Sequence, residues 1–345
     1  MARIRYTTAG ESHGPELTAI LEGLPSGIPL DADLIRADLA RRQLPLGAGG
    51  RMAIETDRAE ITAGVMAGRT TGAPVAMRIA NRNHEAWRGK EVTAFTAPRP
   101  GHADFAAAVK YGYDDIRPAL ERASARETAA RVAVGACCRA FLKEFGIAVA
   151  GRVTSIAGET EESAIAAAIA AAADEGETLG GIIEVTASGL PVGLGSHVSA
   201  DRRLDARLAA AMMSVPAIKG VEFGDGFALA GMKGTATRGR MGGLTGGVTD
   251  GEQLVLRAAM KPIPTTRKPQ PTVDLATGKP AETVYERSDV CPVPRAVVIM
   301  EAMACLTLAD ALAEKLGGDS LAEMKPRFAA LPRTVKLDAG GKVFW

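Results

Sequence analysis

Two histidines lie in short glycine-flanked segments that are rich in charged and hydroxyl side chains. His13 lies in GESHG (residues 10–14) and His102 in RPGHAD (residues 99–104), and the chain has only four histidines. Because an imidazole gains and loses a proton near neutral pH, the pair suits proton transfer. For either histidine alone, the alternative is a turn residue with a satisfied hydrogen bond.

A third segment places arginines at the start of a predicted helix. Ser124-Ala125-Arg126-Glu127 fits the S-x-x-E capping box. The helix that follows is apolar on nearly every side, which predicts a position between other layers of the fold. Arg122 and Arg126 flank Ser124, where free backbone amides at a helix N-terminus bind anions. Surface ion pairs and a bound phosphate are equally compatible with these arginines.

Two further segments carry groups that bind anions or move protons. The glycine-rich stretch 238–261 ends in KPIPT (residues 261–265), whose lysine and threonine suit a phosphate. It has neither a Walker loop nor a G-x-G-x-x-G opening a helix, which excludes a nucleoside triphosphatase. A surface loop without a ligand is the alternative. Asp289 precedes the last long predicted helix, as a turn residue or as a carboxylate that steers a proton.

The elements that must position these residues are mixed helices and strands. Helices are predicted over about residues 31–42, 124–145, 161–174, 201–213 and 294–316, and a strand over 181–188. They lack the regular rhythm of a doubly wound sheet, which favours the α+β class. Because no composition break or proline-rich linker divides the chain, we expect a single domain over residues 1–345.

Composition excludes several classes of protein. Hydrophobic residues make up 47% of the chain, enough for a large core, while a net charge of +1 and 4% aromatics argue against nucleic-acid binding. The four cysteines have no zinc spacing, so we expect no metal and buried free thiols. The N-terminus lacks the apolar core of a signal peptide, and no uninterrupted apolar run reaches about 18 residues. We therefore expect a soluble cytoplasmic protein without membrane contact.

The motifs occur together, and in this order, in the chorismate synthase family. They are GESHG (10–14), RPGHAD (99–104), SARET (124–128), KPIPT (261–265) and RSD (287–289). The likeness continues between them and runs from about Arg3 to Leu316. The resemblance implies a helical layer sandwiched between two antiparallel β-sheets and a homotetrameric assembly.

The resemblance also implies an activity. That family converts 5-enolpyruvylshikimate 3-phosphate to chorismate, in the shikimate pathway of aromatic amino acid biosynthesis, by an anti 1,4-elimination of phosphate. The enzymes are carbon–oxygen lyases and require reduced flavin mononucleotide (FMN), although no net oxidation occurs. An external flavin reductase is an expected partner, and the alternative is reduction of the flavin by NADPH on the protein itself.

Residue roles follow by the same resemblance. His13 protonates or hydrogen-bonds the reduced flavin, His102 assists the departing phosphate, and Asp289 keeps flavin nitrogen 5 ready to receive a proton. Positions that contact the flavin match Arg122, Ala123, Ser124, Gly246, Lys261, Pro262, Ile263, Pro264, Thr265 and Arg287. Substrate-binding positions are expected at Ser12, Arg42, Arg51, Arg99 and Arg126.

Two departures from the family pattern affect ligand contacts. Ala48 stands where the family usually has an arginine, and Gly239 where it usually has an asparagine. Loss of one charged hydrogen bond corresponds to about 1.5–3 kcal/mol. The alternative function is therefore a homologue that binds flavin or a phosphorylated ligand without efficient turnover.

Overall fold

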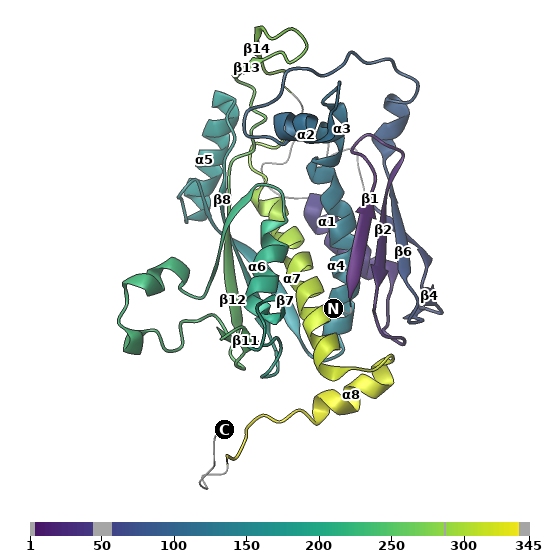
Figure 1. Cartoon of the computed structure of the whole chain (residues 1–345), viewed down its shortest axis with the longest axis vertical. Coiled ribbons are helices and arrows are strands. Elements are labelled where there is room, and N and C mark those ends of the chain that lie inside the picture. Colours follow the sequence, from purple (N-terminus) through teal and green to yellow (C-terminus); the bar gives the residue numbers. More distant parts are fainter. Residues whose placement is uncertain (1–3, 44–56, 286–287, 338–345) are drawn as a thin grey trace.

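Two four-stranded antiparallel sheets enclose a layer of helices (Figure 1). This computed structural model describes residues 4–43, 57–285 and 288–337. The first sheet has the order β1-β2-β6-β3, with β1 at Arg5–Ala9, β2 at Glu16–Glu22, β6 at Val75–Ala80 and β3 at Ala59–Ala63. The second has the order β7-β8-β12-β9, with β7 at Ala148–Ile156, β8 at Gly181–Ser188, β12 at Leu254–Met260 and β9 at Ile218–Phe223.

Each sheet turns one apolar face toward the helices. In β2 the buried residues Leu17, Ala19 and Leu21 alternate with more exposed ones, and β8 follows the same period with Ile183 and Val185. Successive side chains of a strand point to opposite faces, so this alternation buries one face and leaves the other more exposed.

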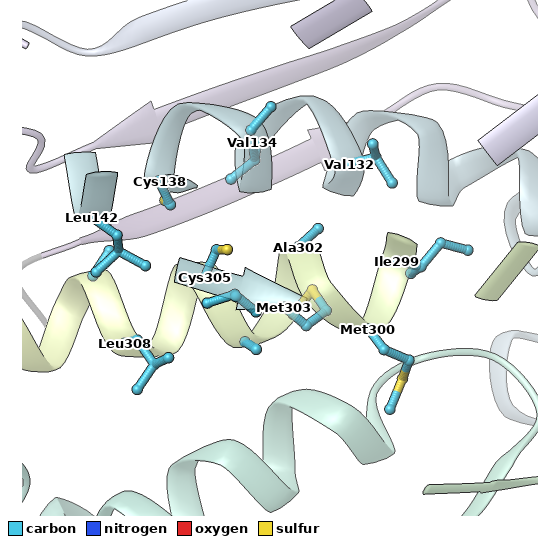
Figure 2. Close-up of a cluster of buried hydrophobic side chains, with 14 of the residues drawn as sticks. Val132, Val134, Cys138, Leu142, Ile299, Met300, Ala302, Met303, Cys305 and Leu308 are labelled. Atoms are coloured by element: carbon cyan, nitrogen blue, oxygen red, sulfur yellow. The ribbon is translucent and has the colours of Figure 1, made fainter. Parts of the chain in front are cut away.

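Two long helices form the centre of the layer. They are α4 (Thr128–Lys143) and α7 (Val293–Leu316), flanked by α1 (Ala32–Gln43) and α6 (Leu204–Met213). The backbones of α4 and α7 approach closely, since a Cβ added at Gly135 would lie 2.2 Å from the Cβ of Ala302. Figure 2 shows the apolar side chains that fill this contact. The expected helical layer between antiparallel sheets is confirmed.

By length and composition α7 is able to cross a membrane, but 94% of its most apolar window is buried inside the protein. A helix buried between two sheets must be apolar on all sides, which accounts for that composition. One cluster of buried side chains extends from the first sheet through this layer to the second. Such continuity is what a single domain over residues 1–345 requires.

Shorter elements complete the described chain. The strands are β4 (Val65–Met66), β5 (Arg69–Thr70), β10 (Leu244–Thr245), β11 (Val248–Thr249), β13 (Pro271–Val273) and β14 (Pro280–Glu282). The α-helices are α2 (Asp104–Tyr111), α3 (Arg117–Arg122), α5 (Glu162–Glu175) and α8 (Leu321–Ala329). The 3₁₀ helices are η2 (Arg82–Ala86), η3 (Ala125–Glu127), η4 (Ala200–Arg202), η5 (Gly226–Gly231) and η6 (Gly234–Ala236).

The predicted capping box is wrong in detail. Ser124 caps the 3₁₀ turn η3 and accepts from the backbone N–H of Arg126, whereas α4 begins only at Thr128. The carboxylate of Glu127 does not return to Ser124, because it accepts from Thr8 and from Arg131. The tighter 3₁₀ turn brings Arg126 into the interior of the fold, where its side chain is 4% exposed.

Candidate active site

His13 lies in the tight loop that joins β1 to β2. The loop begins at Gly10, whose φ of +111° and closeness to the Glu16 carbonyl exclude a side chain. Asn81 closes the loop by donating to the carbonyls of Glu11 and Gly14, at 3.1 and 2.8 Å. The sequence therefore fixes the backbone on both sides of His13.

Glu121 of α3 binds His13 twice. Its carboxylate lies 2.7 Å from the ring Nδ1 of His13 and accepts from the His13 backbone N–H, also at 2.7 Å. Burial raises the pKa of Glu121, but the hydrogen bonds from the His13 ring and backbone lower it more, so its pKa lies below the ordinary value. Glu121 is thus a carboxylate that stays charged beside the His13 ring.

Two aromatic residues from the segment after β6 lie next to His13. The Trp87 ring lies 4.5 Å from the His13 ring, centroid to centroid. His84 places its Nδ1 3.0 Å from the His13 carbonyl, and since a carbonyl only accepts, that nitrogen carries the proton. His84 therefore stabilises the β1–β2 loop by donating a hydrogen bond to the backbone of His13.

His102 has an equivalent carboxylate partner. Its Nδ1 lies 2.5 Å from Oδ1 of Asp104, the fully buried first residue of α2. Arg99 donates through Nε to the other oxygen of Asp104 at 2.8 Å. Burial raises the pKa of Asp104, but the hydrogen bonds from His102 and Arg99 overcome this effect and hold its pKa well below the usual range. Both histidines are thus held through the same ring nitrogen.

Arg99 connects this pair to the KPIPT segment and to Asp289. It donates to the Thr265 hydroxyl at 3.2 Å, and the Thr265 carbonyl accepts from Ser288 at 2.8 Å. The neighbouring Asp289 carboxylate forms a two-point ion pair with Arg295 of α7, at 2.9 and 3.2 Å.

A buried carboxylate, Asp57, joins two arginines beneath the His13 loop. It accepts from Arg42 at 3.1 Å and, at short range, from Arg126. The side chains of Asp57, Arg42 and Arg126 are 1%, 2% and 4% exposed. Arg126 also donates to Asn81 at 2.8 Å, so the arginine pair is connected to the amide that closes the His13 loop.

The structure brings most of the predicted site residues into these connected groups. The Ser124 hydroxyl donates to that of Ser12 at 3.1 Å, and Arg122 binds the carbonyls of Thr8 and Gly10. The partners of the two histidines lie on α2 and α3, which are neighbours in Figure 1.

The turn that holds Gly246 stands apart from this arrangement. Gly246 lies in the turn between β10 and β11, at the end of the molecule opposite α2 and α3 (Figure 1). Arg51 and Arg287 lie outside the described residues. Among the residues that are described, no group of histidine, cysteine or acidic side chains could hold a metal ion.

The sequence reasoning missed Glu121, Asp57, Asn81 and Arg295. Glu121 lies 108 residues from His13, and Asp57 lies 15 residues from Arg42 and 69 from Arg126. Asn81 lies 45 residues from Arg126, and Arg295 lies 6 residues from Asp289. The signal available in the sequence is modest: Glu121 lies one residue before Arg122, and Asp57 six residues after Arg51. No local pattern says which buried carboxylate binds which distant arginine.

Comparisons with known proteins identify the family. The chorismate synthase family profile matches residues 4–313. A chorismate synthase from Caldanaerobacter subterraneus subsp. tengcongensis is 49% identical over 340 residues, covering 94% of this chain and 97% of that protein. One from Moorella thermoacetica is 50% identical over 374 residues, covering 95% and 98%.

A solved structure extends the agreement to the fold. A crystal structure of chorismate synthase superposes with a TM-score of 0.77 at 38% identity, covering 95% of this chain and 97% of that one. Sequence likeness and fold likeness both run over nearly the full length, and the matched region includes both histidine–carboxylate pairs. The chain belongs to the chorismate synthase family.

Proposed function

We propose that this protein converts 5-enolpyruvylshikimate 3-phosphate to chorismate by an anti 1,4-elimination of phosphate, with reduced FMN as cofactor. It then acts as a carbon–oxygen lyase of the shikimate pathway. One observation carries the proposal: His13 and His102 are each held through Nδ1 by a carboxylate. A histidine held in this way presents its other nitrogen, Nε2, for proton transfer.

His13 serves as the hydrogen-bond or proton donor to the reduced flavin. Glu121 contacts the ring at Nδ1 and sets its orientation. The Trp87 ring, 4.5 Å away centroid to centroid and tilted by 43°, packs beside the imidazole. These contacts support a ring held in one orientation within the loop.

His102 assists the departing phosphate. Asp104 orients the ring and Arg99 lies beside it, with Nη2 3.0 Å from His102 Nδ1. A guanidinium next to an imidazole is a suitable partner for a phosphate that gains negative charge as its C–O bond breaks. Arg99 thereby has two roles: it holds Asp104 and offers positive charge to the leaving group.

Arg42 and Arg126 bind the other anionic groups of the substrate, together with Ser12 and Arg51. Both described arginines are fixed by Asp57, so their orientation is set before the substrate arrives. Such preorganisation reduces the entropy lost on binding.

The residues matched to the flavin suit a phosphorylated cofactor. Partial burial lowers the pKa of Lys261, and the charge of nearby Lys219 lowers it further, so two cations lie close together. An anion placed between them would relieve this repulsion. When bound, reduced flavin supplies electron density to the substrate as phosphate leaves and recovers it during deprotonation. Asp289 is the residue proposed to accept or hold the proton near flavin nitrogen 5.

The proposal includes assembly as a homotetramer and an external flavin reductase as the source of reduced FMN. Sedimentation of the purified protein tests the first. NADPH oxidation by the protein with FMN tests the second, because a self-reducing enzyme oxidises NADPH without a partner.

The deciding experiment is an anaerobic assay with chemically reduced FMN. We expect phosphate and chorismate in equal amounts from 5-enolpyruvylshikimate 3-phosphate, and loss of most activity in His13→Asn and His102→Asn. His197→Asn is the matched control, because that residue lies in a loop outside the connected groups described above. Binding of flavin and substrate without turnover would establish the alternative, a homologue that binds but does not catalyse.

A further inference from the structure

Asp115 lies just before α3 and joins that helix to the segment of residues 93–98. Its Oδ1 accepts from the backbone N–H of Arg117 at 2.9 Å and from that of Phe95, 20 residues earlier in the chain, also at 2.9 Å. The Phe95 carbonyl accepts in turn from the Ile116 N–H at 2.9 Å. Both backbone groups of Phe95 are therefore bound to the start of α3. An aspartate that only caps a helix accepts from nearby N–H groups, so the distant contact shows a second role.

Side chains strengthen the same joint. The Phe95 ring packs against a small hydrophobic cluster formed by α2 and α3, whose buried members are Ala108, Ile116 and Ala119. Arg117 of α3 donates through Nη2 to the Thr93 carbonyl at 3.1 Å. The segment is thus held to α3 by backbone, apolar and charged contacts together.

The segment 93–98 leads directly to His102. Two of its carbonyls, at Thr96 and Pro98, accept hydrogen bonds from the β13–β14 hairpin at 3.0 and 2.6 Å. That hairpin lies at the same end of the molecule as α2 and α3 (Figure 1). The next residue, Arg99, donates its backbone N–H to Asp104 at 3.0 Å. Asp104 is the carboxylate that holds the His102 ring.

Helix α3 leads from the same joint to His13. Near its other end Glu121 binds both the ring and the backbone of His13. Asp115 therefore lies where the two elements that hold the histidines meet. We propose that Asp115 is a positioning residue that fixes His13 relative to His102. This inference rests on the proposed function, in which both rings act on one pair of ligands.

Two simpler roles for Asp115 predict different results. If it only caps α3, its loss affects the helix, and through Glu121 the His13 ring, but leaves His102 as in the parent. If it only stabilises the fold, its loss lowers the unfolding midpoint and leaves kcat of the folded protein unchanged. A positioning role requires that both rings are disturbed and that kcat falls.

The kinetic test uses the holoenzyme with reduced FMN and 5-enolpyruvylshikimate 3-phosphate, at a temperature where each variant is folded by circular dichroism. We expect kcat of Asp115→Ala to fall about tenfold or more, because small displacements of reacting groups are costly. KM should stay within about twofold, since Arg42 and Arg126 are held by a different carboxylate, Asp57. Asp115→Asn keeps an acceptor oxygen and should recover about half of the parent kcat. Asp114→Ala is the matched control, because this neighbouring aspartate is exposed.

Nuclear magnetic resonance of the histidine rings tests the positioning without activity. The chain has four histidines, so single His→Asn variants assign every ring signal. We expect Asp115→Ala to shift or broaden the signals of both His13 and His102 and to leave that of the exposed His197 unchanged. Arg117→Met removes the contact with the Thr93 carbonyl and should also perturb the His102 signal, so the joint is tested even if Asp115→Ala does not fold.

Several results would overturn the inference. They are an unchanged His102 signal, a parent-like kcat in folded Asp115→Ala, no recovery by Asp115→Asn, or an equal effect of Asp114→Ala. A parent protein that does not convert the substrate refutes the proposed function instead, and the histidine signals then still decide whether Asp115 fixes both rings.

Discussion

Replacing Glu121 by glutamine removes a charge from beside His13 and changes little else. Glutamine keeps the length of the side chain and an acceptor for the His13 backbone N–H, which now lies 2.7 Å from the carboxylate. The charged contact with ring Nδ1, also at 2.7 Å, is lost. The variant therefore tests whether the carboxylate acts through charge.

The expected size follows from the contact. A hydrogen bond to a charged group contributes about 1.5–3 kcal/mol, and Glu121 is only 12% exposed, so solvent screens it little. If that stabilisation applies when His13 carries a proton, kcat falls by about 10- to 150-fold.

Steady-state kinetics with reduced FMN measure this effect. Glu121→Asp is the matched variant, since it keeps the charge on a shorter side chain and should retain more of the parent kcat than Glu121→Gln. A Glu121→Gln enzyme with kcat within twofold of the parent would refute a charge role for Glu121.

The same residue predicts how stability depends on pH. Its pKa in the folded protein lies below the ordinary value, so it stabilises the fold above its unfolded pKa and loses this contribution as pH falls through the folded pKa. Denaturant titrations from pH 7 to pH 3 should therefore show a steeper loss of stability in the parent than in Glu121→Gln. Equal slopes would contradict the assignment. Three further changes have defined outcomes. Asp104→Asn should lower kcat about tenfold or more and also lower the unfolding midpoint. The reason is that it removes the charge of a buried carboxyl whose pKa is held well below its usual range. Unchanged kinetics would argue against a role for Asp104 in positioning His102. Gly135→Ala should destabilise the protein by about 1–3 kcal/mol in denaturant titrations, because the new Cβ would lie 2.2 Å from that of Ala302, whereas Gly234→Ala meets open space and should be nearly neutral. Lys261→Ala should weaken flavin binding about tenfold by calorimetry with substrate present, and equal affinity would remove Lys261 from the site.

The elements that were predictable from the sequence are those with strong local signals. The expected helix over residues 161–174 appears as Glu162–Glu175, and the expected strand over 181–188 as Gly181–Ser188. Runs of alanine and a clear alternation in these segments reflect local preferences. Strand order in the two sheets depends on pairing between distant segments, and no local pattern encodes it.

The site residues divide in the same way, into those with a local sequence signal and those that depend on the fold. His13 and His102 are recognisable because their neighbours are unusual for histidines in a core, and their motifs match the family. Glu121 is not recognisable, because a glutamate on a short helix is ordinary until the fold brings it to His13. Arg295 is similar: in sequence it is a charge interrupting an apolar helix, and only burial beside Asp289 shows its chemistry.

A crystal structure with FMN and 5-enolpyruvylshikimate 3-phosphate bound tests the central claim most directly, namely that both histidines act on the same pair of ligands. We predict the His13 ring against the flavin, the His102 ring at the substrate phosphate, and a substrate anion at Arg42 and Arg126. Ligands that contact only one of the two histidines, or a substrate bound away from the arginines, would contradict the account.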